Sequence, residues 1–157
     1  MGRIVVGVDG SEGSRQALRW AVEETRLRGA SLEVIHAYEH HLSWLGYGAE
    51  ESMSAAAVEA MHQDMETAAR EAARRAQALV DRMVEGLEGP EVTATAVESS
   101  HPAQALVAHS KGADLLVVGS RGRGGFKSLM LGSVSQQCAH HAECPVVIIR
   151  SEPEEQA

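Results

Sequence analysis

The chain has 157 residues, of which 44% are hydrophobic and 23% are charged, and its 22 acidic residues outnumber the 14 basic ones to give a formal charge of −8. This length and composition predict one soluble globular domain and exclude both a disordered chain and a pair of well-packed domains. The negative charge argues against non-specific binding to the phosphate backbone of nucleic acids.

The N-terminal part predicts a strand, a helix and a second strand. Residues 3–9 (RIVVGVD) form a continuous apolar run that ends at an acidic residue, which is typical of a buried parallel strand. Apolar positions at helical spacing follow, with Ser11 or Ser14 as the candidate N-cap and Gly29 as the stop. Residues 31–38 (SLEVIHAY) predict the second strand.

The middle of the chain predicts a long loop and a long helix. Residues 39–54 contain glycines, serines and aromatic residues, and no fold is assigned to them. From about residue 55 to 85 the sequence is rich in Ala, Glu, Arg and Met, with apolar residues at helical spacing. We expect one amphipathic helix there, whose methionines Met61, Met65 and Met83 pack in the core.

The C-terminal part predicts three strands separated by two helices. The strands cover residues 91–98, 113–119 and 145–149, and the first of them, in which Val and Ala alternate with Thr, suits a sheet edge. Pro102 opens the first helix, and the second covers residues 133–141. The acidic tail at 152–157 is expected to be disordered, which leaves residues 1–151 as the domain.

Strands that alternate with helices predict one open, five-stranded parallel sheet with helices on both faces, because parallel strands are joined by right-handed crossovers. Ligands of such sheets bind beyond the carboxyl ends of the strands, where the strand order reverses. The loops after Asp9 and after Gly119 are therefore the candidate binding loops. From the residues alone, Asp9 is either a turn former or a ligand contact.

The loop after Gly119 carries the strongest functional signal. It reads GSRGRGGFKSLMLGSVS, with two residues between Gly119 and Gly122 and nine between Gly122 and Gly132. Glycines allow sharp turns that bring main-chain N–H groups close to phosphate oxygens. Gly132 and Ser133 open the next helix, and a helix N-terminus is itself an anion site.

Three basic residues, Arg121, Arg123 and Lys127, lie in this loop of an otherwise acidic protein and predict an anionic ligand. The spacing fits neither a Walker loop nor GxGxxG, since Lys127 stands where the last glycine of GxGxxG would fall. The alternative is a flexible surface turn that binds nothing.

The cysteines, histidines and apolar runs give weaker predictions. Cys138 and Cys144 are too few for a disulfide framework and do not form a CxxC motif. With no secretory signal and no apolar run long enough to span a bilayer, we expect a cytoplasmic protein. The adjacent histidine pairs lack metal-chelating spacing, so no metal site is predicted from them.

Several segments together resemble the universal stress protein family (UspA-like), and in particular its ATP-binding branch. They are VGVDGSEGSRQAL, the glycine motif and the C-terminal CPVVIIR, and the resemblance covers nearly the whole chain. It implies a Rossmann-like fold of the adenine nucleotide alpha hydrolase type with strand order 3-2-1-4-5. It also implies a homodimer through the last strand, Val146–Ile149.

The resemblance implies a set of nucleotide-binding residues, to which the basic residues of the loop are added. In chain order these are Val8, Asp9, Ala37, Val118, Gly119, Arg121, Gly122, Arg123, Gly132, Ser133 and Val134. The first three would border adenine and ribose, with Asp9 on the ribose. Val118 and Gly119 would contact the nucleoside, and the later residues would receive the phosphates of ATP, with or without Mg²⁺.

The predicted function is that of an ATP-binding sensor or regulator in the stress response, rather than an enzyme. No nucleophile or general base stands close to the glycine loop in the sequence. A slow ATPase and a nucleotide-free dimeric scaffold stay open as alternatives.

Overall fold

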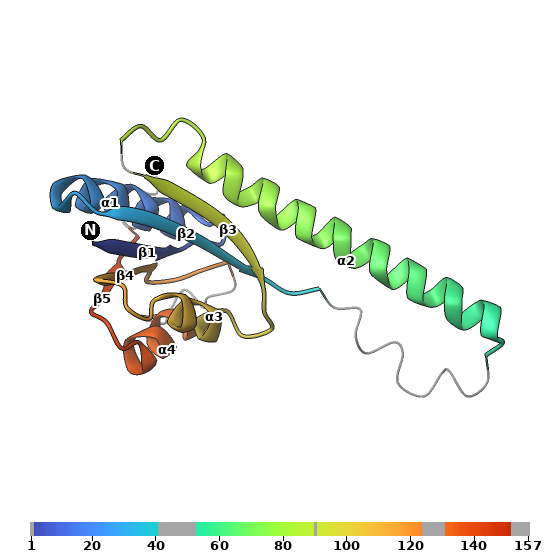
Figure 1. Cartoon of the computed structure of the whole chain (residues 1–157). Coiled ribbons are helices and arrows are strands. Elements are labelled where there is room, and N and C mark those ends of the chain that lie inside the picture. Colours follow the sequence, from blue (N-terminus) through green and yellow to red (C-terminus); the bar gives the residue numbers. More distant parts are fainter. Residues whose placement is uncertain (1, 41–52, 90, 124–130, 152–157) are drawn as a thin grey trace, which may run out of the picture.

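The computed structural model describes residues 2–40, 53–89, 91–123 and 131–151, and the statements below concern these ranges. Most of the predicted loop at 39–54, and the predicted tail at 152–157, lie outside them. Within them strands and helices alternate (Figure 1). In chain order they are β1 (Arg3–Gly7), α1 (Glu12–Arg28), β2 (Ser31–Tyr38), α2 (Ala55–Val84), β3 (Val92–Glu98), α3 (Pro102–His109), β4 (Leu115–Gly119), α4 (Ser133–His141) and β5 (Val146–Ile149).

The five strands form one parallel sheet in the order β3-β2-β1-β4-β5, which confirms the predicted fold. β1 is central, with β2 on one side and β4 on the other, so the strand order reverses between β1 and β4. Val6 aligns with Val34 of β2 and with Val117 of β4. The carboxyl ends of β1 and β4 therefore meet at one edge of the molecule, where the candidate loops begin.

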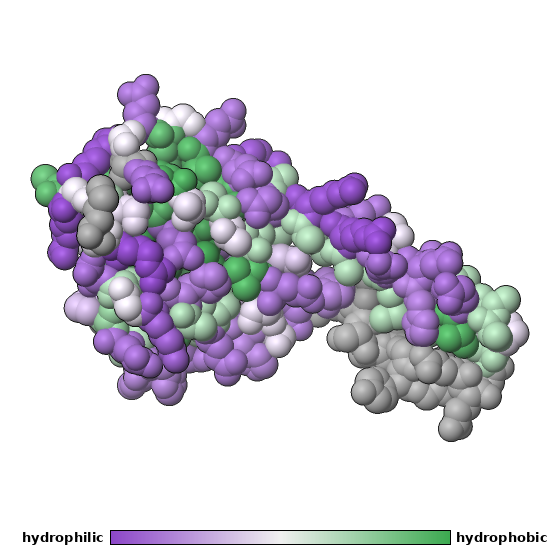
Figure 2. Space-filling view, viewed as in Figure 1, coloured by the Kyte–Doolittle hydropathy of each residue, from purple (hydrophilic) through white to green (hydrophobic). Residues whose placement is uncertain are grey.

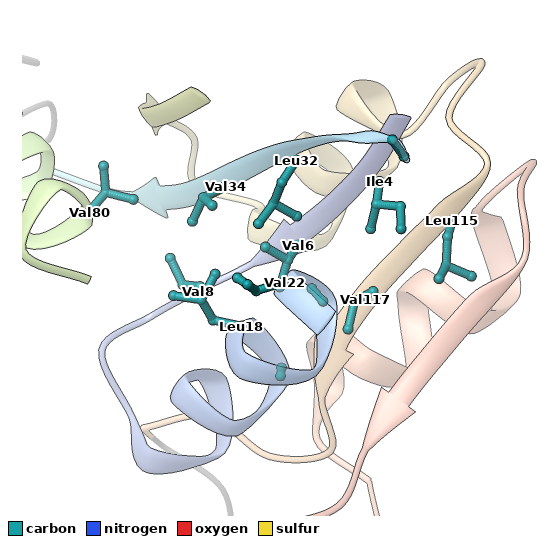
Figure 3. Packing of buried hydrophobic residues seen from close by; sticks show 13 residues of the cluster. Ile4, Val6, Val8, Leu18, Val22, Leu32, Val34, Val80, Leu115 and Val117 are labelled. Carbon is teal, nitrogen blue, oxygen red and sulfur yellow. The ribbon is translucent and has the colours of Figure 1, made fainter. Parts of the chain in front are cut away.

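Two apolar layers lie on opposite faces of the sheet. The first, between the sheet and α1 with the end of α2, includes Ile4, Val6, Val8, Leu18, Val22, Leu32, Val34, Val80, Leu115 and Val117 (Figure 3). The second, against α3 and α4, includes Val5, Ile35, Ala103, Leu106, Ala113, Leu116, Val118 and Cys138. Successive side chains of a strand point to opposite faces, so the continuous apolar runs of β1 and β4 supply both layers.

The ends of α1 follow the sequence prediction. Ser11 is the N-cap, and its Oγ accepts a hydrogen bond from Ser14 N at 3.2 Å. Gly29 ends the helix in the left-handed conformation at φ 61°, which a glycine adopts without the strain of a side chain. Of the two candidate caps, the structure therefore selects Ser11.

The long helix α2 packs on the sheet through its C-terminal half only, and its N-terminal half projects away from the domain (Figure 1). Val80 is fully buried, and Met83 packs against the same core layer, as predicted for Met83. Met61 and Met65 are only partly buried and join neither core layer, so the prediction of core packing was wrong for them. Mildly hydrophobic surface alternates with hydrophilic surface along this projecting half (Figure 2). Within the described ranges, no helix combines the length and apolar character needed to cross a bilayer.

Candidate functional site

A cleft of about 470 Å³ opens at the carboxyl ends of β1 and β4, where the strand order reverses. Its volume falls within the roughly 300–1,000 Å³ typical of small-molecule sites. All eleven residues selected from the sequence line it: Val8, Asp9, Ala37, Val118, Gly119, Arg121, Gly122, Arg123, Gly132, Ser133 and Val134. Lys127, the third basic residue of the loop, lies outside the described residues. The structure thus brings together residues from the two candidate loops, β2 and α4.

The cleft also has walls that the sequence analysis missed. Ile35 of β2 and two residues of α3, Pro102 and Leu106, line it. Leu106 lies over Gly7 of β1, where an added Cβ would come within 2.6 Å of Leu106 Cδ1. No motif marks these residues, because an apolar helix position has the same appearance in sequence whether it faces a core or a ligand cleft.

Val8 lines the cleft with its main chain. Its side chain is buried in the α1 layer among Leu18 and Val34 (Figure 3). Its N–H donates to Ile35 O at 2.8 Å, and its carbonyl oxygen lies 2.9 Å from His36 Nδ1. The pleat of β1 therefore determines which part of Val8 is presented to a ligand.

Asp9 links the two loops of the cleft. Its Oδ1 accepts the N–H of Ser11 at 2.9 Å, and its Oδ2 accepts the N–H of Arg123 at 3.0 Å. Burial by itself would raise the pKa of Asp9, but hydrogen bonds from Ser11, Arg123 and Ser14 outweigh it, so the pKa lies below its ordinary value. The turn-forming role considered for Asp9 is thus observed, and it extends to the glycine loop.

None of the three motif glycines adopts a positive φ, and close approach accounts for two of them, Gly119 and Gly122. A Cβ at Gly119 would lie 3.0 Å from the main-chain carbon and oxygen of Gly13 in α1. A Cβ at Gly122 would lie 2.4 Å from Asp9 Oδ2, whereas one at Gly132 would meet its nearest atom, Ser120 O, at an ordinary 3.4 Å. At Gly119 and Gly122 glycine is therefore favoured by the space beside the main chain and not by a positive φ.

The N-terminus of α4 opens into the cleft without a side-chain cap. Gly132 is the N-cap, and its own N–H donates to Ser120 O at 2.6 Å. Ser135 Oγ also donates to Ser120 O, at 3.1 Å, which fastens the helix start to the end of β4. The first N–H groups of a helix have no partner within the helix, so those of Ser133 and Val134 are placed to bind an anion.

The titratable side chains among the cleft residues described are Asp9, Arg121 and Arg123. The Arg123 guanidinium lies beside the turn after β1, since a Cβ on Gly10 would come within 2.8 Å of Arg123 Nη2. No three His, Cys, Asp or Glu side chains gather as a metal site anywhere in the described ranges. The cleft combines apolar walls with cationic groups and a helix N-terminus.

Comparison with known proteins gives a consistent result. Residues 1–150 match the model of the universal stress protein family. A universal stress protein of Thermus aquaticus is 34% identical over 149 residues, which covers 94% of this chain and 97% of the relative. One from Mycobacterium tuberculosis is 33% identical over 153 residues, or 94% of this chain, but the chain spans only 44% of that relative's length.

Solved structures share the fold. UspA from Lactobacillus plantarum has a TM-score of 0.65 at 22% identity, with 95% of this chain and 97% of that chain covered. A universal stress protein solved in complex with cAMP has a TM-score of 0.55 at 27% identity, with 96% and 98% covered. A family protein from Arabidopsis thaliana with AMP bound has a TM-score of 0.62 at 22% identity, with 100% and 97% covered.

Proposed function

This chain belongs to the universal stress protein family, and on that premise we propose that it binds an adenine nucleotide, with ATP as the first candidate, in the cleft between β1 and β4. The observation that carries the proposal is that eleven residues chosen from the sequence for nucleotide binding line one cleft. The structural neighbour that is 27% identical and was solved with cAMP supports the class of ligand.

The cleft offers a separate place for each part of a nucleotide. Ile35, Leu106 and Val118 form apolar walls suited to a purine, and Ala37 also lines the cleft. Asp9 Oδ2 keeps room for a ribose hydroxyl beside its bond to Arg123 N, because a carboxylate oxygen accepts more than one hydrogen bond. The phosphates would lie at the α4 N-terminus, near Ser133.

We assign the protein a binding role in preference to hydrolysis. Phosphoryl transfer to water needs a group that orients the attacking water. Asp9 is the one carboxylate among the described cleft residues, and in the proposed arrangement it contacts the ribose, away from the γ-phosphate at the α4 N-terminus. Mg²⁺, when it accompanies ATP, would take most of its ligands from phosphate oxygens and water, as is usual for this ion.

We further propose that nucleotide occupancy is read out through a homodimer formed at β5. This strand is an edge of the sheet, and its four apolar residues, Val146–Ile149, are only partly buried. β5 also pairs with β4, and Gly119 at the end of β4 lines the cleft and aligns with Ile149. A ligand that orders the loop after Gly119 would therefore act close to the proposed dimer edge.

Equilibrium dialysis and calorimetry with AMP, ADP, ATP and cAMP, each with and without Mg²⁺, test the binding proposal. Asp9→Ala and Gly132→Val should each weaken binding while the circular dichroism spectrum stays that of the wild type. Ser54→Ala, which removes the remote N-cap of α2, is the matched control and should leave affinity unchanged. No retention of any of these nucleotides at millimolar concentration would reject the proposal.

A further inference from the structure

β3 and β5 are the two edges of the sheet. Each edge strand has main-chain N–H and C=O groups with no neighbouring strand, and such groups can pair with another chain. β3 contains the run VTATAV, which is uncharged, lacks proline and is made of residues that favour strands or are small. Short segments of this kind pair readily with identical segments of another copy when they lie on an open edge. The one charged residue of β3 is Glu98 at its C-terminal end, and the run VTATAV before it has neither the charges nor the prolines that usually protect an edge.

The direction of the outward groups on β3 follows from its ladder with β2. Leu32 N donates to Glu91 O, and Ser99 N donates to Tyr38 O. In a parallel ladder the two main-chain groups of a residue point to the same side, and this side alternates along the strand. The odd-numbered residues of β3 therefore pair with β2. The N–H and C=O groups of Ala94 and Ala96 point to the opposite side of the strand, outward from the edge of the sheet.

Gln77 of α2 occupies this outer side. Its Nε2 donates to Ala94 O at 3.0 Å, and its Oε1 accepts the N–H of Ala96 at 3.0 Å. A residue of a neighbouring parallel strand makes the same two bonds, one to residue j−1 and one to residue j+1. The second hydrogen on Nε2 goes to Asp81 Oδ1 at 2.9 Å, which orients the amide. The half of α2 that carries Gln77 lies along β3 (Figure 1).

We propose that Gln77 mimics a strand residue and closes the β3 edge to the β3 segment of a second copy of this chain. With this edge closed, β5 is the one edge left for strand pairing, so association through strands ends at two copies. With both edges open, each molecule would offer two pairing surfaces, and such contacts can continue into filaments.

The wild-type protein supplies the first test. Both Ala94 N–H and Ala96 N–H point outward, but of these two only Ala96 N–H has a partner among the described residues. Hydrogen exchange followed by NMR should show Ala96 N–H exchanging roughly fivefold or more slowly than Ala94 N–H, as expected for one net hydrogen bond. Equal protection of the two amides would overturn the assignment of Gln77 as an edge cap.

The second test is the association state of Gln77→Met, which keeps side-chain length and helix propensity. It removes both hydrogen bonds to β3, together with the one to Asp81. Light scattering at high protein concentration should show species at least twice the wild-type mass. Gln63→Met is the control, because Gln63 is exposed and, among the described residues, its side chain bonds Glu59, at 3.1 Å. It should keep the wild-type mass.

A double variant locates the contact. Ala96→Pro removes the outward N–H of β3 at an edge position that tolerates proline. Gln77→Met combined with Ala96→Pro should return to the wild-type mass. A wild-type mass for Gln77→Met alone, or large species that persist in the double variant, would reject the proposal.

Discussion

Asp9 and Gly122 share one small space between the two loops of the cleft, since a Cβ on Gly122 would lie 2.4 Å from Asp9 Oδ2. The same oxygen accepts the N–H of the next residue, Arg123, at 3.0 Å. The carboxylate therefore fixes the glycine loop and at the same time occupies the room that any side chain at position 122 would need. Asp9 can therefore hold the loop in this position only because residue 122 has no side chain.

The pair should be coupled in nucleotide binding. Gly122→Ala displaces the carboxylate and should weaken ATP binding by about tenfold, the equivalent of one charge-assisted hydrogen bond. In an Asp9→Ala background the same change should cost less than about threefold, because the clashing oxygen is gone. Calorimetry on the four proteins of the cycle measures the coupling, and strictly additive effects would contradict the shared-space account.

Stability should depend on pH through Asp9. Because its pKa is lowered in the folded state, its stabilising contribution is complete above the ordinary value of 3.8 and is lost as the pH falls from there through the lower folded value. Asp9→Asn cannot ionise, so the stability difference between wild type and this variant should shrink as the pH is taken from 5 down to 3. Urea unfolding at each pH measures it. A difference that stays constant over this range would show that the Asp9 pKa is not lowered.

The glycines of the motif should differ in their structural cost. Gly119→Ala forces a Cβ against the Gly13 main chain at 3.0 Å and should destabilise the fold by roughly 1–3 kcal/mol, as overpacking does. Gly132→Ala meets Ser120 O at 3.4 Å and should cost less than about 1 kcal/mol. Thermal unfolding compares the two, with a shift of roughly 2–4 °C expected per kcal/mol. Equal shifts would mean that α1 moves away from β4 at little cost to accommodate a Cβ at position 119.

The two cysteines should react at very different rates. Burial, with a smaller effect of the neighbouring Cys144, raises the pKa of Cys138 to about 11. Cys144 is partly exposed, whereas Cys138 is fully buried in the layer under α4. At pH 8 iodoacetamide should modify Cys144 first and Cys138 only on unfolding, as peptide mass spectrometry would show. Equal labelling in the native protein would mean that α4 opens readily.

The two halves of α2 should respond differently to truncation of their apolar side chains. Val80→Ala removes a fully buried side chain and should cost roughly 1–3 kcal/mol. Met61→Ala lies on the projecting half and should stay within about 0.5 kcal/mol. Chemical unfolding of both variants measures the difference. A large loss for Met61→Ala would show that this residue packs against a partner.

The sequence by itself determined the series of strands and helices, the parallel sheet, the Ser133 start of α4 and the two candidate loops of the cleft. These follow from local features such as apolar periodicity, capping residues and glycine spacing, all of which involve residues close together in the sequence. The strand order and most of the residues chosen for the cleft came from the family resemblance. The structure confirms the strand order and places those residues around one cleft.

Only the tertiary structure decided which side chains meet. The apolar spacing of α2 is the same on its packed and its projecting halves, so it could not show that Met61 lies outside the core while Val80 lies within it. The positions of Leu106 over Gly7, of Asp9 on the Arg123 main chain and of Gln77 on the β3 edge all depend on residues distant in sequence. Contacts of this kind arise from packing between elements, which no local pattern encodes.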